Sequence, residues 1–515
     1  MKGAVAAGHQ LTADAAAEVL RQGGNAVDAA VCAALASFAV ESPLTGLGAG
    51  GFMLVHTARE NVLLDFFVEV PGRGGTERDA DLVPISVLFD ETPQVFNIGA
   101  ASCAVPGTPA GLAEAIRRFG SMPMSELVRP AISYARDGVP VSAEQAYLFT
   151  VLEPILTEFT ETRELYAPDG RILLEGETFQ FPDLADALER YGAEGPEPFY
   201  RGEVAGAIAD WVTERGGTLS VEDLAAYQPV ARKPVRARFA GREVLTNPPP
   251  SSGGILIAFC LELLERLGSS GEEEVTAVMA EANRARTEEF HAGLYDPSYP
   301  DQFLDASRLD ALAGELRAGG KALAEETRAP GGSASTTHIT VVDGEGRCAS
   351  VTCSNGTGSG ILVPGTGVHV NNMLGEEDLN PLGFHVLPAG RRMTSMMAPT
   401  VVLRDGELEA GLGSGGSNRI RSAILQVILR LAADGLPAHD AVEAGRLHFE
   451  EGVLQAEPGV DERAIGRLER RGVTVARWRR RNLFFGGVQA VTRDPRTGEL
   501  RGGGDPRRGG AVALA

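Results

Sequence analysis

The chain reads ASTTHITVVDGEGRCASVT over residues 334–352, and its interpretation starts from these residues. The polar, glycine-rich run 322–335 predicts an exposed, mobile linker. The alternation of apolar and polar residues after it predicts two strands, 338–343 and 347–352, and the glycines between them indicate a hairpin. Thr336 therefore stands where a loose linker meets the start of a strand.

A threonine in this position can act as a nucleophile if the chain is cut directly before it. The α-amine freed by the cut, with a pKa of about 7.7–8.0, takes the proton from the hydroxyl of the same residue, so no histidine is needed. An ordinary strand threonine is the competing interpretation, because threonine is common in strands. Taken alone, the stretch favours the ordinary threonine, and both interpretations stay open.

The overall charge argues against several classes of partner. The formal net charge is −22. Such a chain repels nucleic acid and anionic membrane surfaces unless a local basic patch intervenes. The strongest basic run, the arginines at 477 and 479–481, is interpreted as a solvated helix end or turn. No apolar run is long enough for a membrane span, and the N-terminal one is too short for a signal peptide. We therefore expect a cytoplasmic protein with no nucleic-acid and no membrane partner.

The sequence shows no pattern typical of a metal or cofactor site. The five cysteines include no CxxC pair, and the eight histidines form no HxH or HExxH spacing. The glycine-rich run 46–51 matches GxGxxG, but a helix is predicted before it and a strand after it, the reverse of a dinucleotide-binding turn. We interpret the run as a tight turn and expect no metal and no cofactor.

Hydrophobic periodicity and capping residues predict the remaining elements. The first two thirds of the chain are predicted to be mainly helical, and the last third to be antiparallel sheet with helix. Predicted helices cover residues 13–22 (N-cap Thr12), 26–40 (N-cap Asn25), 110–119, 124–137, 203–215, 255–267 and 419–433. Predicted strands, besides the hairpin above, cover residues 52–56, 62–66, 400–403, 407–411 and 487–492.

Blocks spread along the whole chain resemble those of one family, the γ-glutamyltransferases or γ-glutamyltranspeptidases. The matching blocks, in family order, are 23–30 (GGNAVDAA), 50–53 (GGFM), 64–66 (LDF), 105–108 (VPGT), 135–138 (ARDG), 199–202 (FYRG), 222–227 (EDLAAY), 248–254 (PPPSSGG), 336–338 (TTH), 371–372 (NN), 395–396 (SM), 399–400 (PT), 413–414 (GS) and 419–420 (RI). The resemblance implies an α+β fold, a four-layer αββα sandwich of the N-terminal-nucleophile hydrolase type. It also implies that Thr336 is the nucleophile.

The resemblance further implies a cut between Ser335 and Thr336. The products would be a large fragment, residues 1–335, and a small fragment, residues 336–515, that begins with the nucleophile. Both would contribute strands to one core, so the cut protein would stay a heterodimer of its own two fragments. Whether it forms a further homo-oligomer stays open.

Other catalytic residues are carried over from the family by position. Ser354 stands where the family has a second hydroxyl, usually Thr, that hydrogen-bonds the nucleophile and can relay a proton. The alternative is a serine that simply caps the turn after it. Gly416 and Ser417 fall where the family places two backbone N–H groups that bind the oxyanion. Backbone donors suit that task because they are fixed before the charge develops.

The substrate-binding positions depart from the family pattern. Phe67 replaces the arginine that clamps the α-carboxylate of a γ-glutamyl group, and its ring cannot donate bidentate hydrogen bonds. Glu376 is the nearest acidic residue in the run that the family uses to bind the α-amine. The remaining positions are a serine pair, here Thr394 and Ser395, and an asparagine, here displaced to Asn355.

The sequence therefore predicts an amidohydrolase or acyltransferase of the γ-glutamyltransferase type that acts on a small-molecule amide. A γ-glutamyl compound such as glutathione is the leading substrate, with Arg73, Arg391 or Arg392 as a candidate replacement cation. Non-glutamyl amides such as oxamate or a β-lactam side chain are the alternative, because the changed positions recognise the head group. An uncut binding protein that kept the fold is a third, less favoured hypothesis.

Overall fold

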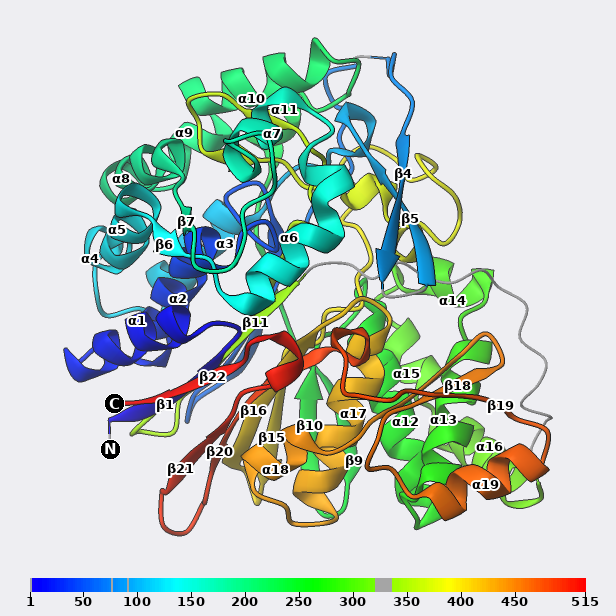
Figure 1. The fold of residues 1–515 in the computed structure, drawn as a ribbon. Helices are drawn as coiled ribbons and strands as arrows, with labels where there is room; N and C mark the ends of the chain where they lie inside the picture. Colours follow the sequence, from blue (N-terminus) through cyan, green and yellow to red (C-terminus); the bar gives the residue numbers. More distant parts are fainter. Residues whose placement is uncertain (1, 76, 90–91, 320–335) are drawn as a thin grey trace.

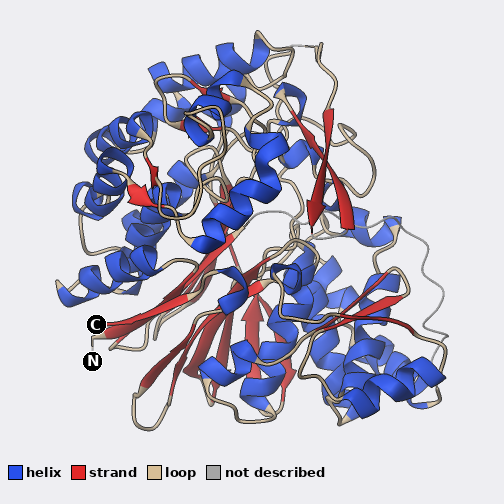
Figure 2. Ribbon diagram, viewed as in Figure 1, coloured by secondary structure: helices blue, strands red, loops and turns tan. Residues whose placement is uncertain are grey.

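The computed structural model describes residues 2–75, 77–89, 92–319 and 336–515, which Figure 1 shows in colour. The predicted linker, and with it one side of the expected cleavage point, lies outside these ranges. The described chain forms two large antiparallel sheets that lie face to face, with helices on both outer faces (Figure 2).

The first sheet has seven strands in the order β22-β1-β11-β12-β2-β3-β8, and every neighbouring pair is antiparallel. Its strands are β1 (Gly3–Ala7), β2 (Gly50–His56), β3 (Asn61–Phe66), β8 (Val230–Arg232), β11 (Thr337–Asp343), β12 (Cys348–Ser354) and β22 (Ala511–Leu514). The β11–β12 hairpin follows the predicted cut, yet it lies between β1 and β2, which precede the cut. The two predicted fragments therefore share one hydrogen-bonded sheet.

The second sheet has six strands in the order β21-β20-β16-β15-β10-β9. Its strands are β9 (Val235–Phe239), β10 (Arg242–Thr246), β15 (Thr400–Arg404), β16 (Glu407–Gly415), β20 (Gly487–Arg493) and β21 (Leu500–Gly503). β16 and β20 contact β11 of the first sheet. Apolar side chains from both sheets, such as Leu54, Phe67, Val401 and Leu412, belong to one buried cluster between them. This cluster is the interior of the sandwich.

Helices cover the outer face of each sheet. α2 (Ala26–Val40) lies against β11 and β12 and is buried along its whole length, as its nearly continuous apolar sequence predicts. α12 (Ser252–Leu267) and α17 (Arg419–Ala432) lie against β9 and β16 of the second sheet. The order helix, sheet, sheet, helix confirms the predicted four-layer αββα sandwich.

Further elements surround these four layers. The other helices are α1 (Gln10–Arg21), α3 (Thr108–Phe119), α4 (Met124–Leu127), α5 (Arg129–Asp137), α6 (Ala143–Leu156), α7 (Thr160–Tyr166), α8 (Pro182–Glu194), α9 (Glu197–Tyr200), α10 (Glu203–Thr213), α11 (Val221–Ala226), α13 (Glu272–Arg284), α14 (Glu288–Gly293), α15 (Tyr299–Phe303), α16 (Ala306–Arg317), α18 (Ala438–Glu443) and α19 (Glu462–Arg470). The small sheets are β4 (Val83–Phe89) with β5 (Thr92–Ile98), β6 (Val139–Pro140) with β7 (Thr178–Phe179), β13 (Leu362–Val363) with β14 (Val368–His369), and β17 (Leu447–Glu450), β18 (Val453–Ala456) and β19 (Thr474–Arg477) together.

Two predicted helices differ from the structure for identifiable reasons. α1 begins at Gln10 rather than after Thr12, and His9 is its N-cap. The Thr12 hydroxyl is used elsewhere, because it donates a 2.7 Å hydrogen bond to the buried Glu41 carboxyl. The single helix predicted for 124–137 is two helices, α4 and α5. Pro130 near the start of α5 has no N–H to continue the preceding turn.

The arginine run begins with Arg477 at the end of β19 and continues through the irregular segment 478–481, so it is neither a helix end nor a regular turn. Arg477 pairs with Glu462 and Glu469, and Arg481 pairs with Glu443. These pairs are largely exposed, so they contribute little to stability. Within the ranges that the structure describes, no helix combines the length and the apolar character needed to cross a membrane.

Candidate active site

Thr336 lies directly before β11, at the centre of the first sheet, and only 4% of its surface is exposed. The register of the β11–β12 hairpin pairs Thr337 with Cys353, which places Thr336 beside Ser354. The Thr336 Oγ1 donates to the Ser354 Oγ at 3.2 Å. The Ser354 Oγ also accepts the Gly356 N–H at 3.1 Å. Ser354 therefore makes both contacts that the sequence left as alternatives, to the threonine and to the turn after it.

A glycine-rich turn at the end of β16 lies against Thr336. A Cβ on Gly415 would clash with the Thr336 carbonyl oxygen, so only glycine allows this close approach. The chain then turns through Gly416, at φ +126°, and Ser417, at φ +51°. This turn joins β16 to α17 and brings both predicted oxyanion residues to within one or two positions of the contact with Thr336.

Two buried carboxyl groups, Asp378 and Glu376, lie close to this turn. The Ser417 hydroxyl donates to Asp378, and Glu376 accepts a 2.9 Å hydrogen bond from the Asn372 amide. Burial raises the pKa of both carboxyls, and the charge of Asp378 raises the pKa of Glu376 further. A Cβ on Gly356 would lie 3.0 Å from the Glu376 Oε1. Glu376 therefore lies next to the turn that carries Ser354. The sequence interpretation missed Asn372 and Asp378, although both belong to the run around Glu376.

Asn355 has a structural position in the same turn and is 1% exposed. Its N–H donates to the Leu44 carbonyl at 2.9 Å, and its side-chain amide donates to the His369 carbonyl at 3.1 Å. Its side-chain oxygen has no hydrogen-bond partner among the described residues.

The Phe67 ring lies in the core between the two sheets. It is fully buried and stacks on Phe52 with ring centroids 5.4 Å apart. Its carbonyl oxygen accepts hydrogen bonds from Arg392 and, at 2.7 Å, from the Tyr227 hydroxyl. The position that carries the clamping arginine in the family therefore supplies no cation here. Its side chain contributes to packing instead.

The three arginines proposed as replacements already have partners. Arg392 lies 3.1 Å from a Glu69 oxygen and 3.7 Å from an Asp65 oxygen, and Arg73 lies 3.2 Å from the other Glu69 oxygen. Burial alone would lower the pKa of Arg392, but Tyr227 and the Asp65 and Glu69 carboxylates raise it. Arg391 lies over the Tyr295 ring at 4.6 Å. Arg392 and Arg73 are thus used in ion pairs near the Phe67 backbone.

Thr394 and Ser395 belong to the loop before β15, and Ser395 contacts the N-terminal end of α12. The Ser395 carbonyl accepts hydrogen bonds from the Ser251 hydroxyl at 2.7 Å and the Ser252 N–H at 2.9 Å. The Ser395 hydroxyl accepts the Met397 N–H at 3.1 Å, so both polar groups are engaged. The Thr394 hydroxyl is buried and has no partner in the described part of the chain. Neither Thr394 nor Ser395 makes a hydrogen bond to Thr336 in the described part of the chain.

Two ionisable side chains next to Thr336 were not predicted as site residues. His338 is bonded to the Thr352 hydroxyl at 2.7 Å and the Thr340 hydroxyl at 2.9 Å, and burial lowers its pKa to about 3. It therefore stays neutral and holds the strands together. Glu41 accepts hydrogen bonds from Thr337 and Thr12. Burial raises its pKa to about 7, against the effect of these two bonds.

A cavity of about 280 Å³ adjoins Thr336. Glu41, Tyr147, Leu483 and Arg508 also contribute to its wall. No cluster of three metal-ligating side chains occurs in the described ranges. The geometry therefore provides a hydroxyl pair, a glycine turn and an adjacent cavity, an arrangement suited to acyl transfer.

Comparison with known proteins gives consistent results over the whole chain. The family model described as gamma-glutamyltranspeptidase matches residues 12–515. The chain is 33% identical to an acylase ACY 1 proenzyme of Pseudomonas sp. (strain SE83), over 96% of this chain and 90% of that protein. It is 32% identical to the glutathione hydrolase proenzyme of Escherichia coli (strain K12), over 95% and 88%.

Solved structures support the same assignment. The cephalosporin acylase from Bacillus halodurans superimposes with a TM-score of 0.85 at 27% identity, over 100% of this chain and 96% of that chain. The Helicobacter pylori gamma-glutamyltranspeptidase gives a TM-score of 0.52 at 28% identity, over 62% of this chain and 92% of that chain. With the match of the family model over nearly its full length, the chain belongs to the γ-glutamyltranspeptidase family.

Proposed function

We propose that this protein cuts itself between Ser335 and Thr336 and then uses Thr336 as the nucleophile of an amidohydrolase or acyltransferase. The observation that carries the proposal is the 3.2 Å hydrogen bond between the hydroxyls of Thr336 and Ser354, at the edge of a cavity and against a glycine turn. The family membership and the proenzyme names of the curated relatives support it.

The proposed cut uses the Thr336 hydroxyl. Its oxygen attacks the carbonyl carbon of Ser335, and the C–N bond breaks as the proton moves to the Thr336 nitrogen. The resulting ester is hydrolysed by water, which leaves a carboxylate on Ser335 and a free α-amine and hydroxyl on Thr336. Ser354 can orient the attacking oxygen and relay its proton.

The substrate amide then reacts in the same geometry. The α-amine takes the Thr336 hydroxyl proton, and the oxygen attacks the amide carbon. The N–H groups of Gly416 and Ser417 stabilise the oxyanion, and the departing amine takes the proton. Water or a second amine resolves the acyl-enzyme. Fragments 1–335 and 336–515 stay together as a heterodimer, because β11 and β12 remain paired with β1 and β2.

The substrate class has two candidates. A γ-glutamyl compound such as glutathione is one, since several relatives carry the name glutathione hydrolase, and Glu376 with Asn355 would bind its head group. A non-glutamyl acyl amide is the other, in line with the acylase names among the relatives. The burial of the Phe67 ring favours the second candidate, because that position offers no cation to an α-carboxylate.

A denaturing gel of the purified protein tests the proposal. Wild type should give fragments of 335 and 180 residues, and Thr336→Ala a single uncut chain. A full-length wild-type chain that binds small amides without turnover would instead support the uncut binding protein. A panel of γ-glutamyl anilides and simple acyl anilides then separates the two substrate classes. Efficient turnover of the γ-glutamyl compounds would contradict the weight given to Phe67.

A further inference from the structure

The cavity beside Thr336 reaches the part of the first sheet that holds β1 and β22. In the first sheet β11 has β12 on one side and β1, then β22, on the other. Ser354 is on the β12 side. The cavity wall includes His9, which follows β1, and Gly509, which precedes β22. Ser354, Asn355 and Glu376 are not part of this wall, although Leu44 of the wall accepts the Asn355 N–H. Apart from Thr336, the residues predicted from the family therefore do not account for the cavity.

Most of the cavity wall is apolar. Val40, Leu44, Tyr147, Leu148 and Leu483 contribute to it. Its volume of about 280 Å³ is enough for a short hydrocarbon chain or a single ring. An apolar wall favours the body of such a group through the hydrophobic effect. The polar groups in the wall then decide which end group the cavity accepts.

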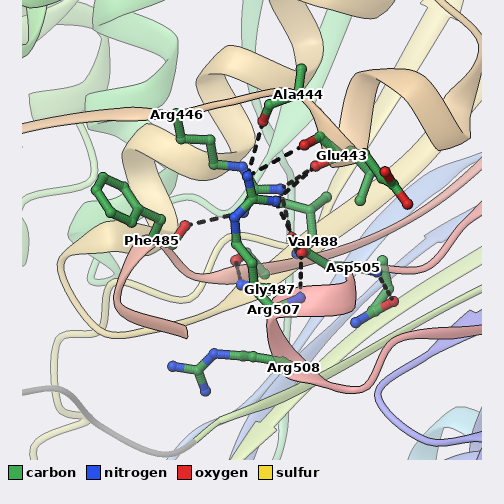
Figure 3. A network of polar contacts seen from close by, with 12 residues as sticks. Glu443, Ala444, Arg446, Phe485, Gly487, Val488, Asp505, Arg507 and Arg508 are labelled. Atoms are coloured by element: carbon green, nitrogen blue, oxygen red, sulfur yellow. Dashed lines mark hydrogen bonds and ion pairs between the residues drawn. The ribbon is translucent and has the colours of Figure 1, made fainter. Parts of the chain in front are cut away.

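Arg508 is the cation in this wall that lacks a carboxylate partner in the described part of the chain. Its side chain extends along Gly487, and its Nη2 lies 3.5 Å from the Leu483 carbonyl oxygen, at the limit for a hydrogen bond. Its Nε has no hydrogen-bond partner among the described residues. Figure 3 shows the guanidinium pointing away from the neighbouring ion-pair network. Burial lowers the pKa of Arg508 to about 10, so it stays charged at neutral pH.

The guanidinium is also close to the reacting centre. A Cβ placed on Gly416 would lie 3.6 Å from the Arg508 Nη2. Gly415, the preceding residue, contacts the Thr336 carbonyl. A group bound to Arg508 would thus be within a few atoms of an amide held at Thr336.

No carboxylate forms an ion pair with Arg508 in the described part of the chain. The charge of Asp505 raises the pKa of Arg508, but the oxygens of Asp505 are paired with Arg446 and Arg507. The Glu41 carboxyl accepts hydrogen bonds from Thr12 and Thr337, and Glu144 is an exposed residue at the start of α6. The protein as a whole carries a net charge of −22 and repels anions. A local unpaired cation is therefore the feature that would make this cavity accept an anion.

We propose that this cavity binds a carboxylate-bearing part of the substrate, with the Arg508 guanidinium paired to the carboxylate and the apolar wall around its carbon chain or ring. The inference rests on the proposed function and specifies its substrate as an amide with a carboxylate on its acyl half or on its amine half. A guanidinium suits this task because it binds both carboxylate oxygens at once.

Matched substrates test the proposal on the cleaved enzyme. Glutaryl p-nitroanilide and pentanoyl p-nitroanilide differ by a carboxylate on the acyl half. The N-pentanoyl amides of 3-aminobenzoate and of aniline differ by a carboxylate on the amine half. Arg508→Gln should lower kcat/KM for one of the two carboxylate substrates by about 30-fold or more, mainly through KM. It should leave the neutral partner within about threefold, because no charge pair is lost there. The pair that responds identifies the half that the cavity holds.

Two further variants control for general effects. Arg508→Lys keeps the charge without the bidentate geometry, so it should fall between wild type and Arg508→Gln. Arg501→Gln removes an exposed arginine on β21 and should affect neither substrate pair. Equal losses for the charged and neutral members of a pair would overturn the proposal and assign Arg508 to the oxyanion or to the fold. No loss for either carboxylate substrate would also overturn it.

Calorimetric titration separates failure of this inference from failure of the proposed function. Glutarate and 3-acetamidobenzoate are added to wild type and to Arg508→Gln. If wild type turns over no amide but binds one of them, and Arg508→Gln does not, the site stands and the proposed function fails. If wild type binds neither compound, the carboxylate site is refuted even where amides are hydrolysed.

Discussion

Arg507 and Arg508 are consecutive in the chain and both line the cavity beside Thr336, but their guanidinium groups have opposite surroundings. Arg507 lies 2.5 Å from a Glu457 oxygen and 3.1 Å from an Asp505 oxygen, and Arg446 lies 2.6 Å from the other Asp505 oxygen. These side chains are at most 1% exposed. Figure 3 shows this network and, beside it, Arg508 with its guanidinium directed away from the network. Arg508 faces the cavity next to Thr336 and has no described carboxylate partner.

The comparison separates arginines that hold the fold from an arginine available to a ligand. The network fixes the end of α18, the Phe485 carbonyl and the start of β20 against one another. β20 pairs with β16, which carries the glycine turn. Changes in the network should therefore reduce stability, whereas changes on the cavity side should affect processing, catalysis or substrate choice.

The largest effect is expected at Thr336, on the cavity side. Thr336→Ala removes the only hydroxyl that this mechanism uses for attack, so the chain should stay uncut and activity should fall by about 10⁴-fold or more. Thr336→Ser keeps a hydroxyl and should still be cut and active, at a lower rate. Gel analysis and a substrate assay check both. An active Thr336→Ala variant would remove Thr336 from the mechanism, with melting temperature as the control for folding.

In the network, Asp505→Ala should reduce the free energy of unfolding by about 3–5 kcal/mol. The carboxylate accepts from Arg446, from Arg507 and from the Val488 N–H, so its loss leaves buried donors and a buried charge without their partner. The matched control is Glu499→Ala, which breaks the exposed pair with Arg501 and should cost less than about 1 kcal/mol. Urea unfolding of both variants in the uncut Thr336→Ala background measures the difference. Equal small losses would mean that the network does not hold the fold.

Glu41, on the cavity side, should make stability depend on pH. Its folded-state pKa of about 7 is above its ordinary value of 4.5, so the folded state keeps a proton that the unfolded state releases. The contribution of Glu41 to stability is therefore largest below pH 4.5 and falls as pH rises towards 7, by about 3 kcal/mol in total. Glu41→Gln should lack this decline.

Urea unfolding of wild type and Glu41→Gln, both with Thr336→Ala, between pH 4.5 and 8 checks this expectation. The variant should become more stable than its parent as pH rises. Glu144→Gln changes an exposed carboxyl of the same cavity and is the control. Parallel pH curves for parent and Glu41→Gln would show that Glu41 ionises normally in the folded protein.

The smallest effect is expected at Ser354. Its hydroxyl orients Thr336 at 3.2 Å, and losing one such hydrogen bond should lower kcat by about 10- to 100-fold. Ser354→Thr restores a hydroxyl and should recover most of the activity. Ser354→Ala and Ser354→Thr are compared by steady-state kinetics after complete cutting. An unchanged kcat in Ser354→Ala would leave the serine only its role in the turn.

Local sequence signals predicted the elements whose contacts are local. The hairpin of β11 and β12 follows from alternation and a glycine turn, and α2 follows from its N-cap Asn25 and its apolar run. β1 was missed because its residues, GAVAA, have no strong strand preference of their own. It is a strand because β11 and β22 pair with it from far along the chain.

The same distinction holds at the candidate site. The family resemblance directed attention to Thr336 and Ser354, and the hairpin register does place them side by side. Their catalytic roles stay predictions. Sequence could not show that Arg392 would be paired with Glu69, or that Arg508 would lie unpaired beside Gly416. Both facts depend on strands that are brought together only in the folded chain.

The most direct test of the account is the intact mass of the purified protein before and after brief exposure to an acyl substrate. The account predicts two polypeptides of 335 and 180 residues, with Thr336 as the first residue of the smaller one. After acid quenching, the smaller polypeptide should carry the mass of one acyl group. An active protein that remains a single chain of 515 residues, or an acyl group on the larger fragment, would contradict the account.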